Sequence, residues 1–309
     1  MTIQTYVLHK MTNIVTEMRI GFMKRTNFGF IGFGLIGGSV AHAIREQYPD
    51  AKIMAYNYYI TKAHPRLELA KMDGILDRIT TDLADFSECD CIFLCAPVIK
   101  NIAYLDHLQP YLSKDCLLTD VGSVKSDILA AVEKHGLQEQ FVGGHPMTGS
   151  EKTGYEHSAS AFFRDKYYVL TPFEQSRPEF IQWMEQFVHD IGSHCMILDA
   201  HIHDAVVAGI SHGPHVISAA LVNTVASLDT DGTYGALAAG GFHGITRISS
   251  SSPEMWQNVC LTNPDQICTF LDRYIEVLTA AKEKVASHDE EGLMNFFADA
   301  KKYRDHIRF

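Results

Sequence analysis

The stretch NFGFIGFGLIGG, residues 27–38, decides the fold of the first half of the chain. It carries glycines in the pattern Gly32-x-Gly34-x-x-Gly37, directly after a short apolar strand and at the start of a helix. In a strand–helix–strand unit the first glycine permits a tight turn, the second lets the backbone approach a pyrophosphate, and the third lets helix and strand pack closely. Free N–H groups at the helix N-terminus favour the phosphates. The stretch therefore predicts a dinucleotide-binding site.

The predicted cofactor contacts extend from this loop to the ends of two later strands. They are Gly32, Gly34, Leu35, Ile36, Gly37, Asn57, Ala96 and Pro97. Asn57 lies twenty residues past Gly37, where an acidic residue usually binds the ribose hydroxyls of NAD. Asn57 is neutral, so it can bond a ribose hydroxyl without repelling a 2′-phosphate, but no arginine stands beside it. We expect NAD as the cofactor, and the sequence leaves NADP open.

Strands and helices alternate from Asn27 to about Leu170. This order predicts a parallel sheet with helices on both faces. The expected strands are 27–31, 52–56, 90–96, 116–121, 141–144, 167–171 and 195–198, and the expected helices are 35–47, 61–72, 99–112, 124–135 and 180–191.

From Asp199, a predicted helix N-cap, the pattern becomes helical. A long helix to about Ser227 carries Pro214, and helices follow from Ser252-Pro253, over 266–286 and over 291–306. The fold class is therefore an α/β Rossmann-type dinucleotide-binding domain at residues 26–198 and an all-α C-terminal domain at residues 199–309. Residues 1–25 are a predicted N-terminal extension.

The composition of the 309-residue chain narrows its function. Hydrophobic residues make up 46% of it, and the net charge of −11 argues against an extended nucleic-acid footprint. The sequence has no run of about 18 apolar residues, so no membrane span is predicted. The N-terminus lacks the features of a signal peptide. Seven cysteines without a Cys-x-x-Cys pair indicate reduced core thiols. We expect a cytoplasmic protein with neither nucleic-acid nor membrane partners.

Two motifs follow predicted strands and carry candidate catalytic residues. His145 stands in GHPMTGSEKTG, residues 144–154, a tight loop at the edge where such sheets bind ligands. A histidine there can take a proton from an alcohol as hydride leaves, although a loop histidine can also simply bond to backbone. Ser123, in DVGSVK at residues 120–125, can cap the next helix and still face the cleft.

The long helix carries ISHGPH at residues 210–215. His212 and His215 are three residues apart and share one helix face, which suits hydrogen bonding to a polar substrate. A metal would need further ligands, and His201 and His203 lie on poorly matched faces, so no metal site is predicted.

Arg247 lies in an otherwise weakly charged stretch, residues 240–250. An arginine there suits bidentate capture of a carboxylate, and the alternative is a surface salt bridge. We expect the nearby Trp256 to pack in the core of the helical domain.

Five motifs in one order resemble the prephenate dehydrogenase family, whose close relatives use arogenate. They are GFGLIGGS, DVGSVK, GHPMTGSEKTG, ISHGPH, and AGGF-x-x-x-TRI followed by Met-Trp. The resemblance runs from about Asn27 to the C-terminal helices. It implies oxidative decarboxylation of prephenate to 4-hydroxyphenylpyruvate in tyrosine biosynthesis, with hydride passed to NAD or NADP. It also implies that the helical domain binds the substrate and forms a homodimer.

The resemblance implies a role for each matching position. His145 would be the base for the ring hydroxyl, Ser123 would orient His145 and the substrate, and Arg247 would hold the ring carboxylate. The other predicted substrate contacts are His215 and Ser211 near the side-chain end, His212, Ser150, and Glu151 at the pocket mouth.

Two departures from the family pattern concern the substrate pocket. Where the family often has Phe-Arg-Asp, this chain has Phe242, His243 and Gly244, so the usual acidic partner of Arg247 is missing. Gly213 replaces a larger apolar residue, and we expect it to widen the pocket.

Two other classes of function compete with this interpretation. A β-hydroxyacid dehydrogenase or imine reductase would place a catalytic lysine on the long helix, and residues 199–227 contain none. A dinucleotide sensor without turnover would not need Ser123, His145 and Arg247. The sequence alone does not decide between prephenate and arogenate, although Glu151 could attract the ammonium of arogenate.

Overall fold

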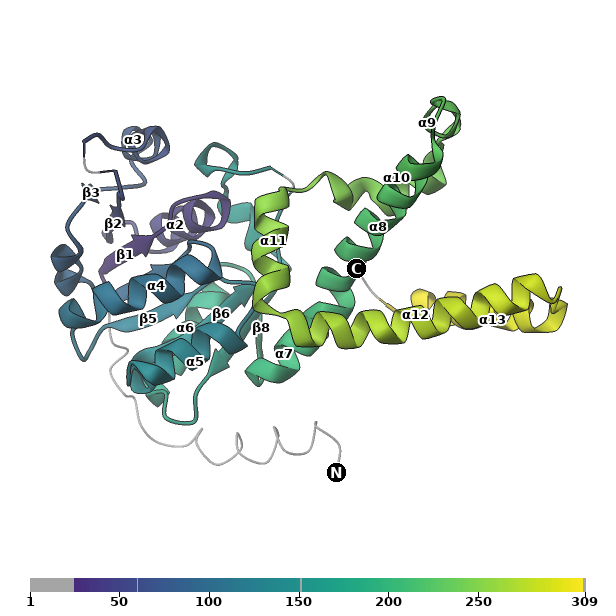
Figure 1. The fold of residues 1–309 in the computed structure, drawn as a ribbon. Coiled ribbons are helices and arrows are strands. Elements are labelled where there is room, and N and C mark those ends of the chain that lie inside the picture. The colour runs from purple at the N-terminus through teal and green to yellow at the C-terminus, as the bar shows by residue number, and fades with distance from the viewer. Residues whose placement is uncertain (1–24, 60, 151, 308–309) are drawn as a thin grey trace.

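The computed structural model describes residues 25–59, 61–150 and 152–307. An eight-stranded sheet in the order β3-β2-β1-β4-β5-β6-β7-β8 forms its first half (Figure 1). The strands are β1 Asn27–Ile31, β2 Lys52–Tyr56, β3 Arg78–Thr80, β4 Cys91–Leu94, β5 Leu117–Asp120, β6 Phe141–Pro146, β7 Tyr167–Pro172 and β8 His194–Ile197. The longer helices of this half are α2 Leu35–Gln47, α3 Pro65–Met72, α4 Val98–Leu108, α5 Ser126–Lys134 and α6 Pro178–Asp190. The predicted α/β domain is therefore confirmed.

The sheet is mixed, not parallel throughout. β6 and β7 pair antiparallel, with His145 opposite Val169, whereas the other neighbouring strands pair parallel. A parallel pair needs a long crossover, usually a helix. Among the described residues between β6 and β7, the only helical elements are the short 3-10 turns Tyr155–His157 and Ser160–Phe163, so the chain returns in the opposite direction. The sequence-based prediction of an all-parallel sheet was wrong at this pair.

Local sequence explains two smaller differences from the predicted elements. The helix predicted from residue 61 begins at Pro65, because the His64 side chain caps it by accepting a hydrogen bond from the backbone N–H of Arg66 at 3.2 Å. β3 was not predicted, since an edge strand of three residues is too short to show alternation.

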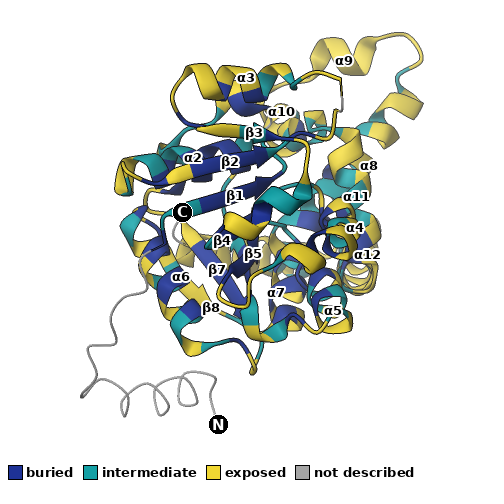
Figure 2. Ribbon diagram, turned by 90° about the vertical axis from the view of Figure 1, so that its left-hand side faces the viewer, coloured by how far each residue is buried: buried dark blue, intermediate teal, exposed yellow. Residues whose placement is uncertain are grey.

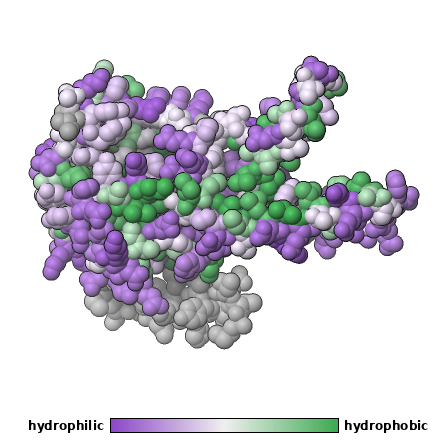
Figure 3. Space-filling view, in the orientation of Figure 1, coloured by the Kyte–Doolittle hydropathy of each residue, from purple (hydrophilic) through white to green (hydrophobic). Residues whose placement is uncertain are grey.

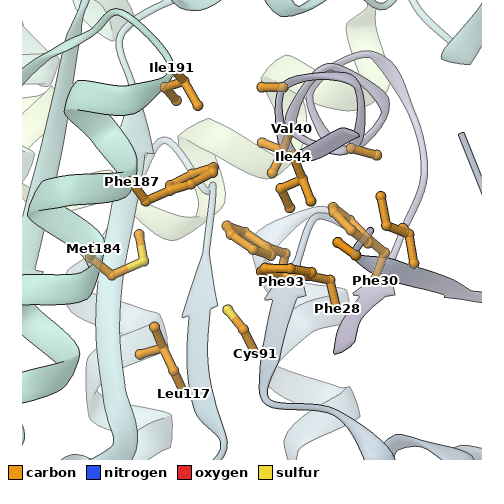
Figure 4. Packing of buried hydrophobic residues seen from close by; sticks show 14 of the residues in the cluster. Phe28, Phe30, Val40, Ile44, Cys91, Phe93, Leu117, Met184, Phe187 and Ile191 are labelled. Carbon is orange, nitrogen blue, oxygen red and sulfur yellow. The ribbon is translucent and has the colours of Figure 1, made fainter. Parts of the chain in front are cut away.

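Apolar layers cover both faces of the sheet. The strands of the sheet are accordingly largely buried (Figure 2). On one face Phe28 and Phe30 of β1 pack with Phe93 of β4, Val40 of α2 and Phe187 of α6, and all five are fully buried (Figure 4). The rings of Phe30 and Phe93 stack with their centroids 5.4 Å apart. Burying each such side chain contributes about 1.5–3 kcal/mol. This packing holds rigid the strand ends that carry the glycine loop.

The second half is helical. Its elements are α7 Ala200–Val207, the π-helical turn Ala208–His212, α8 Gly213–Leu228, α9 Thr233–Leu237, α10 Gly240–Thr246, α11 Pro253–Thr262, α12 Pro264–Ala286 and α13 Glu290–His306. Asp199 caps α7 as predicted, since its carboxylate accepts hydrogen bonds from the N–H groups of His201 and Ile202. α11 packs against α4, whereas α8–α10 and α12–α13 project from the body as two arms (Figure 1).

One helical run, Ala200–Leu228, is long and apolar enough to cross a membrane by length and composition. The mean hydropathy of this run is 1.5, whereas the sequence analysis expected no candidate span. That expectation was wrong because it looked for an unbroken apolar run. It therefore missed a helix in which Ala, Gly, Ser and His stand among the larger apolar residues. A helix that packs in a protein passes the same test. Here the run carries His203 and Asp204, which are buried against the sheet half.

The predicted N-terminal extension lies almost wholly outside the described residues, as does Glu151. All seven cysteines are free thiols. Cys89, Cys91 and Cys116 are buried as expected, but Cys268 is exposed on α12 and is not a core residue.

Candidate active site

The glycine loop has the geometry that a pyrophosphate site needs. Gly32 has a φ of +89°, and a Cβ there would stand 2.5 Å from the backbone nitrogen of Ala96. A Cβ on Gly37 would stand 2.8 Å from the carbonyl oxygen of Gly32. At Gly34 no described atom lies within 4 Å of the Cβ position, so this side of the loop is open. The residues present therefore fit a dinucleotide.

The start of α2 is also suited to phosphate. Gly34 is its N-cap residue, no side chain caps the helix, and its first turn contains no acidic residue. The N–H groups of Leu35 and Ile36 thus remain for an anion, together with the positive end of the helix dipole. The β4–α4 turn at Ala96 and Pro97 packs against this loop and is fixed by the buried Asn101. The amide oxygen of Asn101 accepts a hydrogen bond from the N–H of Ala96, and its amide nitrogen donates one to the carbonyl oxygen of Ala96. Sequence analysis missed Asn101.

Asn57 is buried at the end of β2 and bonds mainly to its own loop. Its amide nitrogen donates to the carbonyl oxygens of Tyr59 and Lys62, at 2.7 and 3.0 Å. Its amide oxygen accepts from the N–H of His64 at 3.2 Å. One lone pair of that oxygen is left for a ribose hydroxyl, so the predicted ribose contact stays a prediction.

His145 lies within β6, one residue before the strand ends, and not in the loop that the sequence predicted. Its Nδ1 lies 2.8 Å from Nε2 of His203 on α7. His203 is 1% exposed, and its Nδ1 lies 2.8 Å from the carboxylate of Asp204. The contact that orients His145 in this structure is therefore with His203, and the orienting role of Ser123 stays a prediction.

Asp204 also joins the helical half to the loop that carries Ser123. Its two carboxylate oxygens accept the backbone N–H groups of Lys125 and Ser126, each at 2.8 Å. These groups belong to the start of α5, so Asp204 caps that helix from another element. The expectation that Ser123 caps it was wrong, and Ser123 remains partly exposed in the loop before the helix.

A fully buried ion pair lies beside His145. The ammonium of Lys125 contacts the carboxylate of Asp120 and donates to the carbonyl oxygen of Gly144 at 2.7 Å. Asp120 accepts in turn from the N–H of Gly144 at 3.1 Å. Removing one partner of such a pair is costly, about 3–5 kcal/mol, because the other charge stays buried. The pair fixes the backbone that carries His145.

These surroundings keep His145 neutral. Burial lowers the pKa of His145 well below its usual range, and His203, Lys125 and His212 lower it further. Burial lowers the pKa of His212 to about 4. Burial would raise the pKa of Asp204, but hydrogen bonds from His203 and Ser126 hold it below its ordinary value. The cluster therefore holds the neutral imidazoles of His145 and His212 beside the ionised carboxylate of Asp204.

The π-helical turn places His212 inside the protein. Asn263, at the start of α12, donates to the carbonyl oxygen of Asp204 at 2.9 Å, and its amide nitrogen lies 3.3 Å from Nδ1 of His212. Asn263 was predicted only as a helix start. Gly213 does not widen the pocket as expected, because a Cβ there would stand 2.2 Å from the ring of Phe270. The glycine lets α12 pack closely against this turn.

His215 and Trp256 form the wall of a cavity of about 620 Å³. Their rings stack with centroids 3.5 Å apart, and Nδ1 of His215 bonds the carbonyl oxygen of Ser211 at 2.9 Å. Trp256 therefore lines the cavity, and the expectation that it packs in the core was wrong. The remaining lining residues are Val216, Ala219, Ala220, Asn223, Ile248, Ser249, Ser251, Pro253, Gln257 and Cys260.

Arg247 begins the 3-10 turn Arg247–Ser250, just after α10. It is exposed, as are His243 and Gly244. Burial lowers the pKa of His215, and the positive charge of Arg247 lowers it further. The guanidinium is therefore close enough to act on His215, which lines the cavity. Ser150 is exposed, and its hydroxyl accepts from the N–H of Lys152 at 3.0 Å.

Besides Asn101, two residues whose roles sequence analysis missed share one property. His203 and Asn263 gain their roles from contacts with other elements, and His203 was considered only as a metal ligand.

Among the described residues, no group of three or more His, Cys, Asp or Glu side chains is arranged to hold a metal ion.

The fold and the site together define a class of protein. A phosphate-binding glycine loop, a neutral histidine at the same carboxyl edge of the sheet and a polar helical pocket are typical of a two-domain, dinucleotide-dependent dehydrogenase. Residues 40–197 match the family described as "Prephenate dehydrogenase, nucleotide-binding domain", and residues 199–299 match "Prephenate dehydrogenase, dimerization domain". The chain belongs to the prephenate dehydrogenase family.

Similar proteins agree with this assignment. The prephenate dehydrogenase of Bacillus subtilis (strain 168) is 33% identical over 277 residues, which are 89% of this chain and 74% of that protein. The cyclohexadienyl dehydrogenase of Zymomonas mobilis is 29% identical over 281 residues, 90% of this chain and 94% of that one. A crystal structure of A. aeolicus prephenate dehydrogenase with hydroxyphenyl propionate and NAD+ has a TM-score of 0.86 and 30% identity, and covers 93% of this chain and 99% of that one.

The family also fixes the general activity. The chain is an enzyme, an oxidoreductase of tyrosine biosynthesis with a nucleotide-binding domain and a dimerization domain.

Proposed function

We propose that this chain converts prephenate to 4-hydroxyphenylpyruvate and carbon dioxide, with NAD+ as the hydride acceptor. The observation that carries the proposal is the position of His145. Its Nδ1 is held by His203, and it lies at the carboxyl edge of the sheet that also carries the glycine loop. Burial keeps its pKa low, so it is a free base at neutral pH.

The chain's own residues supply the binding of the cofactor. NAD+, when bound, accepts hydride from the hydroxyl-bearing ring carbon. The open side of Gly34 and the N–H groups of Leu35 and Ile36 would hold its pyrophosphate, with Gly32, Gly37, Ala96 and Pro97 shaping the loop.

Two observations support NAD over NADP. Asn57 brings no positive charge to the end of β2. The nearby Arg66 is engaged by Glu156, with its guanidinium nitrogens 3.0 and 3.1 Å from the carboxylate oxygens. Neither group is therefore arranged to bind a 2′-phosphate.

His145 would act first as a base and then as an acid. As the hydroxyl-bearing carbon is oxidised, Nε2 takes the hydroxyl proton. Loss of carbon dioxide sends an electron pair into the ring and makes it aromatic, and the phenolic oxygen then takes the proton back. No net proton is released, so a neutral, weakly basic imidazole suits both steps. Ser123, in the adjacent loop, would orient the hydroxyl.

The cavity beside His215 and Trp256 supports prephenate over arogenate. Arg247 would hold the ring carboxylate through its planar guanidinium. His215, Ser211 and His212 would line the side-chain end, and Ser150 and Glu151 the mouth of the pocket. The described cavity lining contains no Asp or Glu that could pair with the ammonium of arogenate, so Glu151 at the mouth is the one proposed contact that could do so. The keto acid side chain of prephenate needs no such partner.

We also propose that two copies of the chain assemble through the helical half. Large apolar side chains are exposed along its helices, among them Leu228, Leu237, Ile275, Leu278 and Phe297. Hydrophobic surface gathers where the two arms meet the body (Figure 3). Such patches mark interaction surfaces, and a mass of twice 34.5 kDa in solution would support the homodimer.

Free thiols throughout the described chain support a cytoplasmic location.

A turnover assay with two substrates and two cofactors tests the proposal. Prephenate or arogenate is paired with NAD+ or NADP+, and nicotinamide reduction is followed by absorbance. We expect the highest kcat/KM with prephenate and NAD+. A higher value with arogenate or NADP+ would overturn that part of the proposal. Silence in all four assays, with NAD+ still bound, would leave the dinucleotide sensor as the better interpretation.

A further inference from the structure

A chain of hydrogen bonds runs from the proposed base to a buried carboxylate. Nδ1 of His145 contacts Nε2 of His203, and Nδ1 of His203 contacts Asp204, both at 2.8 Å. His203 and Asp204 are each 1% exposed. No water is needed to complete the path, since each distance is that of a direct hydrogen bond.

The carboxylate sets the tautomers of both histidines. Asp204 already accepts the N–H groups of Lys125 and Ser126, and hydrogen bonds keep it ionised, so it can only accept from His203. Nδ1 of His203 must then carry a proton. In a neutral His203 this leaves Nε2 as an acceptor, which requires a proton on Nδ1 of His145. Nε2 of His145 is therefore the unprotonated nitrogen, as a base requires.

The charged groups around the two rings differ. His145 faces the ammonium of Lys125 and the imidazole of His212, and the charge of Asp120 is already paired with Lys125. His203 instead faces the carboxylate of Asp204 directly. A positive charge is therefore less costly on His203 than on His145.

From this arrangement we propose that His203 stores the substrate proton during catalysis, so that His145 never carries a lasting positive charge. The inference rests on the proposed role of His145. The hydroxyl proton binds Nε2 of His145 while the proton on its Nδ1 passes to Nε2 of His203. The resulting imidazolium pairs with Asp204. When the ring becomes aromatic, both protons return, and none is gained or lost.

The fold explains why this relay is built from two domains. His145 belongs to β6 of the nucleotide-binding half, whereas His203 and Asp204 belong to α7 of the helical half. Asp204 also caps α5, next to the loop that carries Ser123. The base is thus complete only when the two halves are packed together.

The test compares three variants of the full-length enzyme: His203→Gln, His145→Gln and, as a matched control, His201→Gln. A glutamine at 203 can still accept from Nδ1 of His145, but it cannot take a proton. His201 lies on the same helix, is exposed and is outside the relay. Steady-state rates against pH with prephenate and NAD+ give kcat and KM, and the melting temperature and NAD+ affinity report on folding.

We expect His203→Gln to lower kcat by roughly 10²-fold with KM changed less than about threefold. The acid limb of its pH profile should move down by about one pH unit, because His145 is then left to titrate alone beside Lys125. A merely structural loss would not move the limb downward. An unmoved limb, or a kcat within threefold of wild type, would overturn the relay. If His145→Gln itself stays active, the proposed base fails and not the relay alone.

A measurement on the wild-type enzyme keeps the proposal testable if His203→Gln does not fold. Nitrogen NMR of histidine-labelled protein reports the tautomer of each ring, and the His145 signal is assigned by its loss in His145→Gln. We expect the proton of neutral His145 on Nδ1. A proton on Nε2 would overturn the proposal.

Discussion

The substitution Gly213→Ala tests how closely the π-helical turn packs against α12. The Cβ that it adds would stand 2.2 and 2.4 Å from two ring carbons of Phe270. Real Cβ atoms do not approach an aromatic ring so closely, so the ring or α12 must move. His212 precedes this glycine and His215 follows two residues later, and both are proposed substrate contacts.

The expected magnitude follows from two opposing effects. Alanine is favoured over glycine within a helix by about 1 kcal/mol. Overpacking a rigid ring costs about 3 kcal/mol, the upper end for such insertions, because the clash involves the near edge of the ring. The net loss of unfolding free energy is about 2 kcal/mol, equivalent to a fall in Tm of about 3 °C for a chain of this length.

A double-mutant cycle isolates the contact. We expect Gly213→Ala to cost about 2 kcal/mol in the wild-type background and less than about 1 kcal/mol when Phe270→Ala has removed the ring. Denaturant titrations and thermal melts of the four proteins give the values. An equal cost in both backgrounds would show that Phe270 is not the obstacle and would refute the packing argument.

Three further predictions concern the site. Arg247→Ala should raise KM for prephenate about tenfold or more with little change in kcat; an unchanged KM would remove Arg247 from the substrate site. Gly34→Ala should weaken NAD+ binding and leave Tm almost unchanged, because its Cβ would meet no other atom of the fold. Gly32→Ala should lower Tm, because its φ is +89° and its Cβ would clash with the backbone nitrogen of Ala96. Isothermal titration measures the NAD+ affinity of each variant, and melting curves measure its Tm. Because His212 has a pKa of about 4 in the folded chain and about 6.5 when unfolded, the unfolded state binds more protons below pH 6.5. Stability should therefore fall by up to about 3 kcal/mol from pH 6.5 to pH 4, and His212→Gln should flatten that dependence.

Much of the fold was predictable because its signals are local. The glycine loop needs only twelve consecutive residues. The buried strand β4 is apolar throughout, as strands covered on both faces are. The antiparallel pairing of β6 and β7 was missed, although its signal was present: no helix was predicted between the two strands.

The candidate site was less predictable because its key contacts join distant segments. His145 was found from its place after a strand, but its partner His203 lies 58 residues further along the chain. Nothing in the local sequence of α7 separates a histidine that contacts His145 from any other helical histidine. Gly213 was taken as a sign of a wider pocket, since a sequence does not show that Phe270 fills the space.

The most direct test of the account measures products when the purified chain meets prephenate and NAD+. We expect NADH, carbon dioxide and 4-hydroxyphenylpyruvate to form in equal amounts, and His145→Asn to slow all three together by about 10²–10⁴-fold while NAD+ still binds. NADH formed without carbon dioxide, or near wild-type turnover by His145→Asn, would contradict the central claim that this histidine drives an oxidative decarboxylation.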